Sequence, residues 1–142
     1  MARDTLDTLL RLRRLEVRQQ MRALAAAMRA EEQACLTRDT WAATIVREAA
    51  EARTLAEHDA ALAGFVPWRA RATQTLRDAE AQVGAAGEAA QAARVALGEA
   101  RGAMRAVELA MERRQVEADL AGQRLAQHAL EDAARRPGGA GR

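Results

Sequence analysis

The chain has 142 residues, enough for one folding unit. Hydrophobic residues make up 49% of it but aromatic residues only 2%, and much of the hydrophobic share is alanine, which buries little surface. This composition argues against a thick globular core and favours a thin pair of helices. The 22 basic residues, all arginine, nearly balance 20 acidic ones. A net charge of +2 therefore argues against a nucleic-acid-binding protein, despite a pI of 9.8.

The cellular compartment is predicted from three features that the sequence lacks: a second cysteine, a long apolar run and a secretory signal. Cys35 is the only cysteine, so no internal disulfide can form, and a reduced, cytoplasmic setting is expected. No apolar run reaches the roughly 18 residues that a membrane-spanning helix needs. Residues 1–4 are not followed by the apolar segment of a secretory signal. We therefore expect a cytoplasmic protein that is at most peripheral to a membrane-embedded apparatus.

A first helix is predicted to begin near Leu6 and to run without glycine or proline up to Gly64. Its apolar residues recur at steps of three, four and seven, which places them on one face. These residues are Leu10, Val17, Met21, Leu24, Met28 and Cys35. After Glu31 and Arg38 the apolar face shifts by about one residue, towards Trp41. The shift indicates either a local stutter in a coiled coil or a less regular helix.

The segment 64–68, Gly-Phe-Val-Pro-Trp, is the strongest break in the middle of the chain. Gly64 suits the end of one helix and Pro67 the first turn of the next. A short connection between two long helices makes them antiparallel. We therefore predict an all-α fold, a long antiparallel two-helix coiled coil (helical hairpin), over residues 1–136 with its tip near 64–68. Residues 137–142 are predicted to be a disordered C-terminal tail.

The second helix has the clearest heptad pattern, between Ala72 and His128. One row contains Leu76, Val83, Ala90, Leu97, Met104, Met111, Ala118 and Leu125. The other row contains Ala79, Ala86, Ala93, Ala100, Val107, Arg114, Ala121 and His128. Small residues along such a stripe allow two helix backbones to approach closely. We expect the partner to be the first half of the same chain.

Folding about a tip near residue 65 makes specific facing pairs. Met28 is predicted to lie opposite Met104, and the inward charge of Glu31 near Arg101. The methionines would then form a packed cluster, or a groove for a partner.

Phe65 and Trp68 fall at this predicted tip, where there is little core to cover them. Exposed aromatic side chains there would form a docking point for a partner. The alternative is that they fold back and pack on Leu62 and Ala72.

The residues needed for catalysis or for cofactor binding are scarce. The chain has no serine nucleophile and no glycine-rich phosphate loop. His58 and His128 would lie far apart in the predicted hairpin, so a shared metal site is not expected. We predict no catalytic residue, no cofactor and no metal, and hence a protein that is not an enzyme.

Four parts of the sequence carry a resemblance to a known family. They are the arginine-rich residues 9–18 (LLRLRRLEVR), Trp68 after the predicted turn, residues 107–114 (VELAMERR) and residues 123–136. Together they resemble the FliJ/YscO family, the general stalk components of flagellar and injectisome type III export.

The resemblance implies a coiled-coil stalk similar to the γ subunit of rotary ATPases. Such a stalk enters the central hole of the export ATPase hexamer and promotes its assembly and activity. It also contacts the cytoplasmic part of the export-gate membrane protein and, in some members, export chaperones. The candidate ring-facing residues are Arg11, Arg13, Arg14, Arg18, Glu112, Arg113 and Arg124, because arginine forks pair well with carboxylates.

Two other classes of protein fit the sequence less closely. One is a generic coiled-coil adaptor or structural protein, dimerising through the stripe near Trp41. The other is a membrane-surface helix, but its apolar face would be broad and rich in large side chains rather than narrow and rich in alanine. Whether the export system is flagellar or an injectisome stays open.

Overall fold

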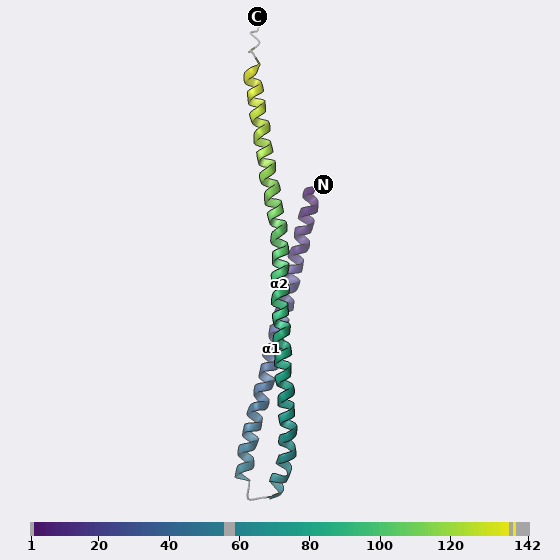
Figure 1. The fold of residues 1–142 in the computed structure, drawn as a ribbon, viewed down its shortest axis with the longest axis vertical. Helices are drawn as coiled ribbons and strands as arrows, with labels where there is room; N and C mark the ends of the chain where they lie inside the picture. Colours follow the sequence, from purple (N-terminus) through teal and green to yellow (C-terminus); the bar gives the residue numbers. More distant parts are fainter. Residues whose placement is uncertain (1, 56–58, 137, 139–142) are drawn as a thin grey trace. The chain divides into compact units, whose positions relative to one another are not determined.

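Two long helices make up the structure. The computed structural model describes residues 2–55, 59–136 and 138. Helix α1 spans Ala2–Thr54 and helix α2 spans Asp59–Arg135, and the described residues contain no strand. The two helices pack against each other (Figure 1), which confirms the all-α fold and the helical hairpin. Of the predicted disordered tail at 137–142, only Gly138 is described, and it is exposed and non-helical.

The turn of the hairpin does not lie at residues 64–68, so the predicted tip position was wrong. Helix α1 ends at Thr54 and α2 begins at Asp59, and the segment 64–68 is helical throughout. Pro67 lies inside α2, where it supplies no N–H to the helical hydrogen-bond ladder. As a result the two helices are unequal, with 53 residues in α1 and 77 in α2.

The contacts divide the chain into two units. Unit 2 comprises residues 16–100, and unit 1 comprises residues 1–15 together with residues 101–142. The prediction of a single hairpin over residues 1–136 stays a prediction, and the two units are described separately below.

The pairing of the helices within unit 2 can be read from two neighbouring pairs. A Cβ atom placed on Gly87 would lie 3.5 Å from Oε1 of Glu31, in ordinary van der Waals contact. The negative charge of Glu80 contributes to raising the pKa of Arg38, as expected for neighbouring side chains. Both pairs belong to one antiparallel register, because a step of seven residues forward in α1 matches a step of seven residues backward in α2. The predicted pairing of Glu31 with Arg101, about four helical turns further along α2, was therefore wrong.

The core of unit 2 is a thin stripe of small residues. Its buried side chains are Val17, Ala72, Ala79, Ala90 and Leu97, and Ala90 has no exposed surface at all. Four of the five lie on the two predicted heptad rows of α2 or on their direct continuation. The rows are therefore confirmed as the face that α2 turns toward α1.

The inner face of α1 follows one uninterrupted row with a step of seven residues. After Val17 the row continues through five half-buried residues: Leu24, Glu31, Arg38, Ile45 and Ala52. No stutter is needed, because Glu31 and Arg38 occupy the row themselves. Their long stems can cover the small residues of α2 while the charged ends reach the edge of the interface.

Two of the predicted inner-face methionines lie elsewhere. Met21 and Met28 are each 49% exposed, so they do not belong to the buried face. The predicted packed cluster of methionines is therefore wrong. The apolar residues that suggested it follow a neighbouring row of α1, beside the one that meets α2.

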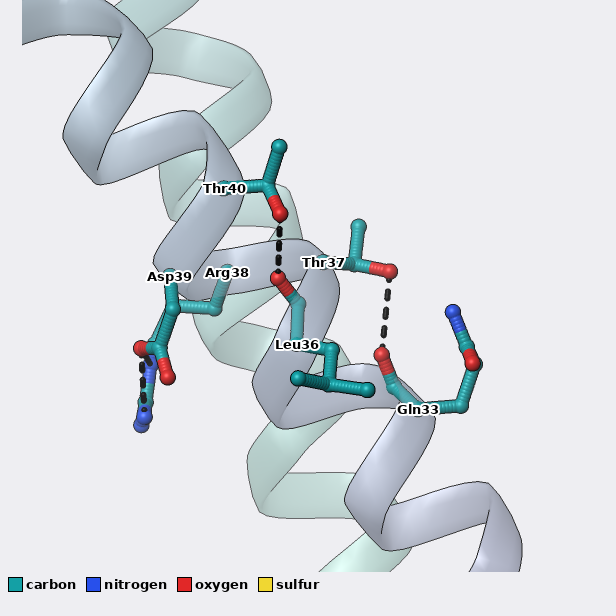
Figure 2. Close-up of polar contacts among 6 residues, drawn as sticks. All are labelled: Gln33, Leu36, Thr37, Arg38, Asp39 and Thr40. Carbon is teal, nitrogen blue, oxygen red and sulfur yellow. Dashed lines mark hydrogen bonds and ion pairs between the residues drawn. The ribbon is translucent and has the colours of Figure 1, made fainter.

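A run of polar residues in the middle of α1 satisfies its hydrogen bonds locally. Figure 2 shows the hydroxyls of Thr37 and Thr40 donating to backbone carbonyls four residues earlier, at 3.0 and 2.8 Å. It also shows Nε of Arg38 donating to the carboxylate of Asp39 at 2.9 Å, and this bond raises the pKa of Arg38. The charge of Arg38 at the interface is thus balanced by the neighbouring Asp39, and the helix continues without a break.

Unit 1 contains a short packed stretch and a long exposed one. Leu10 and Val107 are its buried residues, and Met111 is half buried. From residue 112 to residue 136 every residue is exposed. We call residues 112–135 the C-terminal extension of α2, and Figure 1 shows it running past the start of α1. The heptad rows were therefore predicted correctly up to Met111, and beyond that point the row residues are exposed.

Substitution of alanine for Gly98 is expected to stabilise the protein by about 1 kcal/mol. Gly98 is exposed within α2, and a Cβ atom added there meets nothing within 4 Å. Alanine would lower the backbone entropy of the unfolded chain without a steric clash. Thermal unfolding followed by circular dichroism should show a higher Tm for Gly98→Ala, and an unchanged or lower Tm would contradict a continuous helix at this point.

Candidate functional site

The arginines predicted on α1 fall into different surroundings. Arg11 and Arg14 are exposed in unit 1. Arg13 is half buried, because it lies three residues after Leu10 and shares the inner face of the helix. Arg18 is exposed but belongs to unit 2. Of the four, Arg11 and Arg14 present their guanidinium groups most freely on unit 1.

Glu112 takes part in a charge cluster along α2. Nη1 of Arg105 lies 3.0 Å from a carboxylate oxygen of Glu112 and 3.2 Å from one of Glu108. The hydrogen bonds to Glu112 and Glu108 raise the pKa of Arg105. Arg105 was not among the predicted site residues, although it precedes Glu108 by three residues and Glu112 by seven.

Arg113 and Arg124 are exposed on the C-terminal extension. Unit 1 therefore combines, in one body, six of the seven predicted ring-facing residues, and only Arg18 falls outside it. The exposed members of this set are available to a partner, while Arg13 is partly covered by its own helix pair. Their role in binding stays a prediction.

The C-terminal extension also exposes large apolar side chains that were not among the predicted site residues. Four of them are exposed by 46% or more: Val116, Leu120, Leu125 and Leu130. Leu125 lies on a heptad row, whereas the other three lie off both rows. The extension is thus apolar on more than one side, and nothing in the described part of unit 1 covers it.

Phe65 and Trp68 lie within α2 rather than at a tip. Their rings stack with centroids 5.8 Å apart and an interplanar angle of 26°, and both residues are half buried. Together with Ala52 and Leu55 of the α1 end, they line a shallow open hollow in unit 2. Their position at the tip was predicted wrongly, and a docking role for them stays a prediction.

The part of the chain that the structure describes has neither a metal-ligand cluster nor a membrane-spanning helix. It contains no group of three or more His, Cys, Asp or Glu side chains arranged to hold a metal ion. Neither described helix is long and apolar enough to cross a bilayer. Cys35 is half buried, and His58, which the metal argument used, lies outside the described residues.

Comparisons of the chain with protein-family models, with curated proteins and with solved structures each found no match. Support for a function therefore comes from the fold, the exposed charges and the sequence resemblance.

Proposed function

We propose that this chain is a non-enzymatic stalk of a type III protein export apparatus. In this role it inserts into the export ATPase ring, promotes the assembly and activity of the ring, and links it to the export gate. Its partners would be the ATPase hexamer, the cytoplasmic part of the export-gate membrane protein and export chaperones. The hairpin of two long helices supports the proposal, because a stalk of this family needs that fold.

The exposed surface of unit 1 supports the proposal beyond the fold alone. In unit 1, the exposed Arg11 and Arg14 of α1 accompany a helical extension that is exposed on every side. The extension carries Arg113 and Arg124 together with leucines on and off the heptad rows. A helix surrounded by a ring meets partner surface on all sides, and arginine forks can pair with carboxylates lining the hole. Unit 1 is therefore the part that we expect the ring to surround.

The direct test is the effect of the protein on a purified export ATPase. The rate of ATP hydrolysis should rise when the full chain is added, and the two proteins should co-elute. The double variant Arg11→Glu, Arg14→Glu should weaken this stimulation about fivefold, because it reverses the two exposed predicted arginines that α1 contributes to unit 1.

The matched control reverses two exposed arginines of unit 2, as Arg22→Glu and Arg29→Glu. It changes the net charge by the same amount but should leave stimulation close to that of the unmodified chain. Absence of both stimulation and co-elution would contradict the proposal, and equal losses in the two double variants would contradict the assignment to unit 1.

The alternative, a generic coiled-coil adaptor, shares the same fold. Its predicted contact was an uncovered stripe near Trp41. Trp41 is half buried on the inner face of α1, so the structure does not favour that contact.

A further inference from the structure

The shallow hollow of unit 2 joins an aromatic wall to two carboxylates. Its apolar wall contains Phe65 and Trp68, whose rings stack with centroids 5.8 Å apart, and Leu55 from the end of α1. Glu48 and Glu51 of α1 supply the charged part of the lining, and none of its described lining residues is basic. The hollow thus presents an aromatic surface beside two negative charges.

The part of the chain that contributes the hollow is acidic, although the whole chain is not. Residues 48–68 contain four acidic residues against one arginine, a net charge of −3, whereas the complete chain carries +2. Arg47 and Arg69 flank this segment. Nη2 of Arg47 lies 3.7 Å from a carboxylate oxygen of Glu48, which is longer than a hydrogen bond. The charge at this end of unit 2 therefore favours a cationic ligand.

Large apolar side chains near the hollow are exposed. Leu55 is 51% exposed, Leu62 is 36% exposed and Val66 is 67% exposed. Phe65 and Val66 follow Leu62 by three and four residues, so the three share one side of α2. Exposed apolar side chains that gather in one place are typical of a protein-binding surface. A ligand for this surface therefore needs apolar groups next to its cation, as a polypeptide segment has.

We propose that a basic segment of a partner protein binds this end of unit 2, and that one of its arginine side chains occupies the hollow. The planar guanidinium stacks on the ring of Trp68, which is half buried and so keeps part of its surface accessible. Its N–H groups donate to the carboxylates of Glu48 and Glu51. The hollow measures about 280 Å³, just below the roughly 300–1,000 Å³ of small-molecule sites, which suits a single side chain.

This docking surface is independent of the export function proposed above. It belongs to unit 2, whereas the proposed ring contact belongs to unit 1. The experiments that test it contain no ATPase, so their failure would leave the export proposal standing. Likewise, a chain that does not stimulate the ATPase would leave the docking surface standing.

The first test follows the fluorescence of Trp68 in a Trp41→Phe variant of the full chain, where it is the only tryptophan. The probe is a synthetic peptide with capped ends and the sequence Leu-Arg-Ala-Leu-Arg. We expect a saturable change with a Kd below about 1 mM, and a weaker affinity at high salt. The same peptide with citrulline in place of both arginines keeps their shape but not their charge. It should bind about tenfold more weakly.

The second test changes the lining of the hollow. Glu51→Gln removes one carboxylate and should raise the Kd of the arginine peptide about threefold. Glu88→Gln is the matched control, because Glu88 is an exposed glutamate of unit 2 that does not line the hollow, and it should leave the Kd unchanged. Trp68→Leu, measured by titration calorimetry, should raise the Kd about fivefold. Circular dichroism would verify that every variant keeps its helix content.

Equal affinities for the arginine and citrulline peptides would overturn the inference, as would equal effects of the two glutamine substitutions or the absence of saturable binding. Sedimentation equilibrium without peptide tests whether a second copy of this chain covers the same surface. We expect no dimer that depends on Trp68. A dimer that Trp68→Leu dissociates would assign the surface to self-association and overturn the inference.

Discussion

Replacing Ala90 with glutamate is expected to destabilise the protein by about 3 kcal/mol or more. Ala90 has no exposed surface and lies on the row of α2 that faces α1 in unit 2. A carboxylate at this position would be buried between two helices, where burial of a charge is costly. The loss is large against the roughly 5–15 kcal/mol that stabilise a typical domain. Urea unfolding followed by circular dichroism would measure it.

The adjacent residue supplies the control for this substitution. Ala89 is exposed on the same helix, and Ala89→Glu introduces the same charge and nearly the same helix propensity. Its effect should stay within about 0.5 kcal/mol, as for most surface substitutions. Similar losses from the two variants would contradict the assignment of the inner face.

Replacing Pro67 with alanine is expected to stabilise the protein by up to about 3 kcal/mol. Pro67 lies inside α2 and is exposed, so an alanine there restores an N–H to the hydrogen-bond ladder and removes no buried contact. The Tm measured by circular dichroism should rise clearly.

Whether the Tm rises or falls distinguishes between the two positions of the turn. Gly64→Ala should also stabilise the protein, by about 1 kcal/mol, since a Cβ atom at Gly64 meets nothing within 4 Å. If the chain turned at residues 64–68, the same two substitutions would remove a helix-ending glycine and a helix-starting proline, and both should destabilise it. A lower Tm for both variants would therefore contradict the structure.

The sequence was sufficient to predict the fold class and the inner face of α2. Its two rows between Leu76 and Met111 consist of apolar residues at strict heptad spacing, with alanine filling most of one row. Such a pattern has one physical solution, a narrow stripe against another helix. Burial of Ala79, Ala90, Leu97 and Val107 agrees with it.

The position of the turn could not be predicted from local signals. Gly64 and Pro67 are strong helix breakers, whereas residues 51–58 contain neither glycine nor proline. In the structure the heptad row of α2 extends backwards through Ala72 to Phe65, opposite the end of α1. Helix pairing over several turns therefore outweighs the local cost of one proline and one glycine.

The same error of register affected the inner face of α1 and the candidate site. The charged Glu31 and Arg38 were expected to interrupt the seam, but the small residues opposite leave room for their stems. Likewise, Arg13 and Arg14 look equivalent in the sequence. They differ because Arg13 lies on the face of α1 that meets α2 and is half buried, whereas Arg14 lies off that face and is exposed.

The unequal helix lengths follow directly from the corrected turn. Helix α1 ends at Thr54 and α2 begins at Asp59, and every residue from 112 to 136 is exposed. The C-terminal extension, on which the proposed ring contact depends, could not have been inferred while the turn was placed at 64–68.

The most direct test of the account is a comparison of two distances by electron paramagnetic resonance. In a Cys35→Ser background, spin labels are placed on Glu32 and either Ala85 or Glu99, all of which are exposed residues of unit 2. Ala85 and Glu99 are two heptads apart and share one side of α2, so they differ by about 21 Å along the helix axis. The helix register of the structure predicts the shorter distance for Glu32 with Ala85. A shorter distance for Glu32 with Glu99 would place the turn at residues 64–68 and contradict it.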